Sequence, residues 1–156
     1  MQEALADIRR LVYDLRPPAL DQLGLVSALR DYAARQGAAG LQVSIDALEP
    51  LPPLPAAVEV AAYRITLEAL SNVVRHAQAQ HCRIQLRVNG GLHLEIADDG
   101  RGLAPEQRHG VGITAMRERA KELGGHCTVS AGSSGGTLVR AWLPVVAVQM
   151  DAAEML

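Results

Sequence analysis

Apolar residues recur at the spacing of an α-helix in four segments of the chain. The first pattern stops at Pro17-Pro18, because proline interrupts a helix. The second begins at Asp21, whose side chain can cap a helix, and ends at Gly37. A proline-rich stretch at 49–55 suits a stiff connector. The predicted helices are residues 3–16, 21–36, 56–78 and 113–123.

Alternation of apolar and polar residues predicts β-strands at 41–47, 82–88, 92–98, 126–131 and 136–143. The turn signals Asn89-Gly90-Gly91 and 133–136 join two of the pairs as hairpins. Most of these strands are apolar on one face only, so one side of the sheet should face water. We therefore expect an α+β fold, a two-layer α/β sandwich. A mixed, mostly antiparallel sheet of about five strands would pack on three helices.

The composition of the chain mainly excludes certain kinds of partner and site. A chain of 156 residues with a net charge of −2 fits one domain and gives no sign of a nucleic-acid or acidic-membrane surface. The two cysteines, Cys82 and Cys127, form no CxxC motif, so we expect buried free thiols in a reducing compartment. The sequence has no signal peptide pattern and no apolar run long enough for a membrane span. We expect a soluble, intracellular chain.

The stretch LHLEIADDGRG, residues 92–102, places an acid on the apolar face of a strand. Asp98 is in phase with Ile96 and should point inward, whereas Asp99 should point outward. A buried carboxylate without a partner costs several kcal/mol, so Asp98 needs one. Thr137 also faces the core in the last predicted strand. Together they suit a flat apolar ligand with exposed donors, such as a purine with its amine, although Thr137 could instead be bonded within the sheet.

The helix at 56–78 carries polar residues on its core-facing arc. Asn72 lies inside that arc, Glu68 lies at its edge and His76 follows Asn72 by one turn. Asparagine and glutamate oxygens suit a hard cation such as Mg²⁺. The alternative, that Asn72 and His76 bond core backbone groups, stays open from the sequence.

Glycines occur in two pairs, Gly100 with Gly102 and Gly110 with Gly112. The second pair precedes the predicted helix at 113–123, where free backbone N–H groups and the positive end of the helix dipole could hold a phosphate. Each of these glycines could equally be an ordinary loop residue.

Other nucleotide and metal sites fit poorly. GVGITA, residues 110–115, matches a dinucleotide fingerprint, but no strand precedes it. A phosphate-binding P-loop needs a Gly-Lys pair, and the only lysine, Lys121, lies within a predicted helix. His76, His81 and Cys82 are poorly spaced for zinc. We also find no serine-hydrolase pattern.

Taken together, several motifs of the chain resemble those of a known protein family. E-A-L-x-N-V-x-R-H-A, D-D-G-R-G, G-V-G-I, M-R-E-R-A-x-E-L-G-G and G-G-T occur in this order. The set resembles the ATP-binding domain of bacterial sensor histidine kinases, which shares the Bergerat-type ATP-binding fold with gyrase, Hsp90 and MutL. DLRPPALDQLGLVSALRDY is similar to the nitrate/nitrite-sensor subfamily. The match covers roughly residues 5–145.

The resemblance implies roles for matching residues, with ATP and Mg²⁺ as cofactors. Glu68 would act as the base or would polarise the phosphoacceptor, and Asn72 would hold the Mg²⁺. Asp98 would accept a hydrogen bond from the adenine amine, and Thr137 would join it through water. The remaining ATP-binding positions would be Arg75, His76, Gly100, Gly102, Gly110, Val111, Gly112 and Ile113. The four glycines among them would shape a mobile lid.

The resemblance also implies partners. No histidine precedes His76, so the phosphoacceptor would lie on an upstream dimerisation domain outside this chain. Residues 1–19 would be the remnant of that helical hairpin, 20–146 the ATPase domain and 147–156 a loose tail. We expect a homodimer in the full-length kinase, a cognate response regulator, and a cytoplasmic location within a membrane-anchored sensor. We expect neither nucleic acid nor membrane contact for this chain.

Two rival functions share this fold. One is a non-catalytic, ATP-dependent interaction module, against which the retained Glu68 argues. The other is a serine kinase of the anti-sigma-factor type, against which the LRPPALD segment argues, because it resembles part of a dimerisation hairpin.

Overall fold

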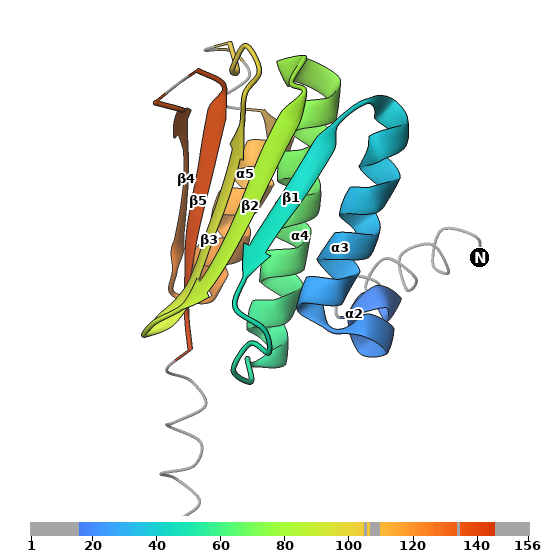
Figure 1. Cartoon of the computed structure of the whole chain (residues 1–156). Coiled ribbons are helices and arrows are strands. Elements are labelled where there is room, and N and C mark those ends of the chain that lie inside the picture. Colours follow the sequence, from blue (N-terminus) through green and yellow to red (C-terminus); the bar gives the residue numbers. More distant parts are fainter. Residues whose placement is uncertain (1–15, 105, 107–109, 134, 146–156) are drawn as a thin grey trace, which may run out of the picture.

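A computed structural model of the chain describes residues 16–104, 106, 110–133 and 135–145 (Figure 1). Its helices cover one face of a five-stranded sheet, which is the two-layer arrangement predicted above. The strands are ordered β1-β2-β3-β5-β4 across the sheet. Their bounds are β1 Gln42–Ala47, β2 His81–Val88, β3 Gly91–Asp98, β4 His126–Ala131 and β5 Thr137–Pro144.

The sheet is mixed and mostly antiparallel, as expected. β1 pairs with β2 in parallel, and the other three neighbouring pairs are antiparallel. Alternating residues of the central strands point toward the helices and are buried. For example, Ile84 of β2 is the register partner of Ile96 of β3, and Ile96 is the register partner of Val139 of β5. This one-sided alternation keeps the register, because a slip by one residue would turn every apolar side chain outward.

The helical layer contains α2 Pro18–Leu23, α3 Leu25–Gln36, α4 Ala56–Asn72 and α5 Val111–Glu122. A short 3₁₀ turn, η1 Gly37–Ala39, follows α3, and a π-helical turn, η2 Val73–Ala77, continues α4. α4 and η2 together match the helix predicted at 56–78, whereas α5 begins two residues earlier than predicted. None of the helices in the described part of the chain combines the length and apolarity needed to cross a membrane.

The helix predicted over 21–36 is wrong at its start. The chain forms α2, breaks at Gly24, which has φ 79°, and starts α3 at Leu25. Asp21 caps neither helix; it lies within α2 and forms an ion pair with Arg16. The break lets Leu20, which is 1% exposed, enter the core.

Some predictions fall outside the described residues: the helix at 3–16, most of the lid at 103–109, and the tail after residue 146. The boundary expected between 19 and 20 falls within α2, and the domain division stays a prediction. Both cysteines are free and buried, as expected. Burial raises the pKa of the Cys82 thiol to about 12 and that of Cys127 to about 11, so both favour the unreactive thiol form.

Candidate functional site

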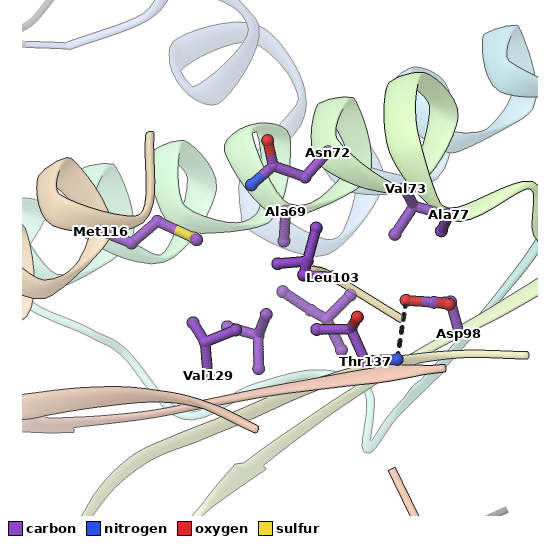
Figure 2. A pocket seen from close by; sticks show the side chains of 11 residues that line it. Ala69, Asn72, Val73, Ala77, Asp98, Leu103, Met116, Val129 and Thr137 are labelled. Carbon is purple, nitrogen blue, oxygen red and sulfur yellow. Dashed lines mark hydrogen bonds between the residues drawn. The ribbon is translucent and has the colours of Figure 1, made fainter. Parts of the chain in front are cut away.

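Two adjoining pockets lie where α4 and η2 pass over the ends of β3 and β5. The inner pocket lies between the helices and the sheet and is lined by Ala69, Asn72, Val73, Ala77, Ile96, Asp98, Leu103, Met116, Val129, Thr137 and Val139 (Figure 2). The outer pocket is lined by Glu68, Asn72, Arg75, His76, Leu103, Gly110, Val111, Gly112 and Ile113. Asn72 and Leu103 belong to both linings and therefore form the wall between the pockets.

Asp98 points into the inner pocket, as the phase of its strand predicts. It is 8% exposed and ends β3. Its Oδ1 accepts a hydrogen bond from Gly100 N–H at 2.9 Å, and its Oδ2 accepts one from Thr137 N–H at 3.3 Å. Burial raises the pKa of this carboxyl, and the two backbone bonds partly oppose the rise. Backbone donors thus partner the buried acid, and its remaining lone pairs are available to a ligand.

Asp99 points outward, also as predicted, but it has a structural role that the sequence did not suggest. Its Oδ1 accepts from the backbone N–H groups of Gln80 and His81, and its Oδ2 lies 2.9 Å from His81 Nδ1. The hydrogen bonds from His81 are the main reason that the pKa of Asp99 falls to about 2. Asp99 therefore fastens the start of β2 to the end of β3.

Glycines allow close backbone packing behind Asp98. A Cβ at Gly136 would lie 2.0 Å from the carbonyl oxygen of Asp98, and one at Gly100 would lie 2.2 Å from the carbonyl oxygen of Ala77. The loop after β3 is also tied to η2, because Arg101 N–H donates to the Ala77 carbonyl at 2.8 Å. Gly100 and Gly102 thus shape this loop without lining either pocket.

The polar residues of α4 and η2 gather on the outer pocket. Glu68 lies 3.7 Å from the Arg75 guanidinium, and η2 carries both Arg75 and His76. Asn72 accompanies them, and no described residue hydrogen-bonds its side chain. Within the described residues, the alternative that Asn72 bonds core backbone groups therefore has no support, whereas for His76 it stays open. A π-turn at this point widens the helix, a feature that is frequent at functional sites.

The first turn of α5 closes the other side of the outer pocket. Gly110 is its N-cap and offers no side chain, so the N–H groups that open the helix have no side-chain cap. A Cβ at Gly112 would lie 2.0 Å from Glu68 Oε1, which shows how closely α5 approaches that carboxylate. Ile113 is buried beneath the turn, while Val111 is 89% exposed at its rim. This arrangement suits an anionic group such as a phosphate.

The chemistry of the outer pocket also fits a hard divalent cation. Glu68 and Asn72 supply oxygen atoms, and the described residues contain no group of three or more metal-binding side chains. Mg²⁺ commonly takes only one or two protein oxygens and completes its shell with phosphates and water. A zinc site built from His76, His81 and Cys82 has no support among the described residues.

The apolar lining of the inner pocket is not evident from the sequence. Leu103, Met116 and Val129 lie around it together with residues expected only to form the core. Met116 lies in the helix predicted at 113–123 and Val129 in the strand predicted at 126–131, and neither pattern indicates a cavity. Leu103 belongs to a loop, so no periodicity could have located it.

Similarity to known proteins agrees with this geometry. Residues 57–147, more than half of the chain, match the family described as histidine kinase-, DNA gyrase B-, and HSP90-like ATPase. The histidine-protein kinase/phosphatase DegS of Brevibacillus brevis is 31% identical over 93% of this chain and 39% of its own length. UhpB of Salmonella typhimurium, also named a histidine-protein kinase/phosphatase, is 36% identical over 88% of this chain and 28% of its own length. The chain therefore spans well under half the length of these relatives.

Solved structures share the fold. The blue-light activated histidine kinase of Erythrobacter litoralis superposes with a TM-score of 0.72 at 20% identity, covering 95% of this chain and 51% of that one. The ATP binding domain of PrrB from Mycobacterium tuberculosis gives 0.54 at 21% identity, covering 77% of this chain and 93% of that one. The motif resemblance is confirmed at the level of the family. The chain belongs to the histidine kinase-, DNA gyrase B- and Hsp90-like ATPases.

Proposed function

We propose that this chain is the ATP-binding catalytic domain of a sensor histidine kinase. The inner pocket takes the adenine, and the outer pocket takes the triphosphate with Mg²⁺. One observation carries this proposal: the buried carboxylate of Asp98 lines the inner pocket, the start of α5 lines the outer pocket, and Asn72 lines both.

The inner pocket supplies what an adenine needs. Asp98 retains acceptor capacity for the adenine amine, and such a charge-assisted hydrogen bond is worth roughly 1.5–3 kcal/mol. Ile96, Val139 and Met116 offer apolar surface to the faces of the ring. Guanine carries a carbonyl in place of that amine and would set an acceptor against the carboxylate, so ATP should be preferred over GTP. Thr137 is placed to join the same network through a water molecule.

The outer pocket supplies what a triphosphate needs. Backbone N–H groups at the start of α5 and the cationic side chain of Arg75 face the same space, and His76 lines it. Mg²⁺ held by Asn72 would neutralise phosphate charge, which is the main requirement of phosphoryl transfer. The glycines at 110 and 112 keep this side of the pocket free of bulky side chains.

Glu68 is the candidate catalytic group. It would accept the proton of the attacking imidazole, or polarise that ring, while the new N–P bond forms and the bond from the γ-phosphorus to the bridging oxygen breaks. ADP leaves with the electron pair of that bond. The histidine would come from an upstream dimerisation domain of the longer protein. The phosphoryl group would then pass to an aspartate of a response regulator, within a homodimeric sensor whose catalytic part is cytoplasmic.

Reconstitution tests this proposal. The chain is mixed with a separately produced helical hairpin that bears the phosphoacceptor histidine, and γ-labelled ATP with Mg²⁺ is added. We expect acid-labile phosphohistidine on the hairpin and its loss in Glu68→Gln, while Glu95→Gln, on the open face of the sheet, behaves as wild type. ATP binding without transfer would instead support a non-catalytic interaction module, and a failure to bind ATP would refute both.

A further inference from the structure

The face of the sheet that turns away from the helices carries a row of four neighbouring side chains, which we call the open-face row. In the order of the strands these are Arg87 of β2, His93 of β3, Trp142 of β5 and His126 of β4, each the register partner of the next. They alternate with the buried residues of their strands and therefore point away from the core. The helices of the described part of the chain pack on the other face and leave this row uncovered (Figure 1).

Arg87 differs from the other two arginines on this face of the sheet. Arg83 pairs with Asp46 at 3.1 Å, and Arg140 pairs with Glu95 at 2.9 Å. Arg87 forms neither a hydrogen bond nor an ion pair with a described residue, and its charge is the smallest of the influences on the pKa of Asp46. A guanidinium carries five N–H donors in a planar fork that matches a carboxylate. Within the described residues, the donors of Arg87 are therefore available to a ligand.

A solvent-open pocket lies at the Arg87 end of the open-face row. It is lined by Gln85, Arg87, Asn89, His93 and Glu95. His93 Nε2 donates to the Asn89 carbonyl at 3.1 Å, which holds the imidazole at the side of the pocket. Because the carboxylate of Glu95 is already paired with Arg140, the charge that the pocket offers to a ligand is that of Arg87. The pocket therefore suits a carboxylate.

Trp142 offers an aromatic surface next to this pocket. It is the only tryptophan of the chain, and it is partly exposed on the open face. A Cβ at Gly91 would lie 2.6 Å from Trp142 Nε1, so glycine at this position lets the indole lie across the start of β3. The ring of His126 flanks the indole at a centroid distance of 5.7 Å. Tryptophan and arginine are the side chains that most often dominate the binding energy of protein interfaces, so the row has the composition of an interaction surface.

We propose that the open-face row binds an acidic segment of a partner protein. A carboxylate of that segment lies in the pocket and accepts hydrogen bonds from Arg87, while a neighbouring aromatic side chain packs on Trp142. An extended peptide places the side chains of residues i and i+2 on the same side, roughly 7 Å apart, so an acid and an aromatic with this spacing can reach both groups. The inference goes beyond the proposed function, because the nucleotide pockets lie between the helices and the other face of the sheet.

Nucleic acid fits this surface less well than an acidic peptide. A phosphate backbone crossing the open face would also pass the carboxylates of Asp46 and Glu95, and the chain as a whole has a net charge of −2. One available guanidinium beside an indole matches a single carboxylate with an aromatic neighbour better than it matches a polyanion.

Titration with defined peptides tests the surface, and Trp142 is the reporter because it gives the only tryptophan fluorescence of the chain. Capped Gly/Ser peptides that contain Glu-x-Phe, Gln-x-Phe or Glu-x-Ala are added to the whole chain. We expect saturable binding of the Glu-x-Phe peptide and at least about fivefold weaker binding of the other two. Arg87→Gln should weaken Glu-x-Phe binding at least about fivefold, because a hydrogen bond between charged groups is lost. The matched control is Arg83→Gln on the same strand, whose charge is already paired with Asp46 and which should change the affinity less than twofold.

Three results would overturn the proposal: no saturable binding even at millimolar peptide, equal affinity for the Glu-x-Phe and Gln-x-Phe peptides, or equal effects of the two arginine substitutions. Tighter binding of an oligothymidylate that is lost in Arg87→Gln would assign the row to nucleic acid instead. Self-association of the chain that is lost in Arg87→Gln would assign it to a second copy. None of these titrations contains ATP, so they decide on the open-face row whether or not the proposed function holds.

Discussion

The carboxylate of Asp98, at the end of β3, accepts a hydrogen bond from the backbone N–H of Thr137, at the start of β5, at 3.3 Å. This bond joins residues 39 positions apart at the floor of the inner pocket. It continues the antiparallel pairing of the two strands, whose register ends at Ala97 and Leu138. The acid therefore belongs both to the sheet and to the pocket, and the two roles can be separated by substitution.

Asp98→Asn should lower ATP affinity at least about tenfold, because a charge-assisted bond to the adenine amine becomes a neutral one or is lost. Asp99→Asn is the matched control, since its side chain points away from both pockets, and its affinity should change less than twofold. Titration of both variants with a fluorescent ATP analogue measures the effect. Equal losses in the two variants would contradict the assignment of Asp98 to the base.

Asp99 should instead influence stability in acid. Its pKa is about 2 in the folded protein, below the ordinary value of 3.8, so its ionised form stabilises the fold above pH 3.8. That contribution is lost as the pH falls from 3.8 through 2. The stability difference between wild type and Asp99→Asn should thus be fully present well above pH 3.8 and should shrink toward pH 2. Urea denaturation across this range measures it, and a difference independent of pH would contradict the role of the charge.

Much of the fold could be predicted because the sheet is buried on one face only. In β3 and β5 the phase of the apolar residues sets which side chains point inward, and Asp98 and Thr137 follow the same phase. The break at Gly24 was missed because the apolar pattern continues across it. Asp21 looked like a cap from its neighbours in sequence, but in three dimensions Arg16 is its partner.

The parts of the site that could not be predicted depend on long-range geometry. Asp99 meets Gln80 and His81 only because β2 and β3 pair in register. Leu103 reaches the inner pocket only because Arg101 ties its loop to η2. Neither contact can be predicted from the spacing of these residues along the sequence.

Asn72→Ala should abolish the dependence of ATP binding on Mg²⁺. The side chain lines both pockets, and an amide oxygen is a suitable ligand for the ion. Calorimetric titration with Mg²⁺ and with a chelator measures the two affinities. The matched control is Ser71→Ala, the preceding residue of α4, whose side chain lines neither pocket and should leave the metal dependence intact. Metal-dependent binding that persists in Asn72→Ala would move the metal site elsewhere.

Gly112→Ala should reduce phosphoryl transfer more than ATP binding. The new methyl group would lie 2.0 Å from Glu68 Oε1, and the flexible side chain of Glu68 would have to swing away. We expect ATP affinity within about threefold of wild type and a transfer rate at least about tenfold lower, because a small displacement of a catalytic group is costly. The reconstituted transfer assay and ATP titration measure the two effects.

Gly136→Ala provides the contrast to Gly112→Ala. Its methyl group would meet the backbone oxygen of Asp98 at 2.0 Å, and the residue has φ 74°, so neither side can yield cheaply. We expect a lower denaturation midpoint as well as weaker ATP binding. For Gly112→Ala, by contrast, a transfer rate equal to that of wild type would contradict the catalytic role proposed for Glu68.

Leu20→Ala should show whether α2 is part of the folded domain or only a link to whatever precedes it. Leu20 is 1% exposed within the main core, and Arg16 lies 3.7 Å from Glu59 at the start of α4, so two contacts fasten this segment. Truncation of a fully buried leucine costs about 2–5 kcal/mol. Leu23→Ala, on the same helix but 47% exposed, should cost no more than about 0.5 kcal/mol. Urea denaturation gives both values, and a small loss in Leu20→Ala would mean that α2 packs without stabilising the domain. A large loss would mean that α2, which begins at Pro18, is an integral part of the domain core.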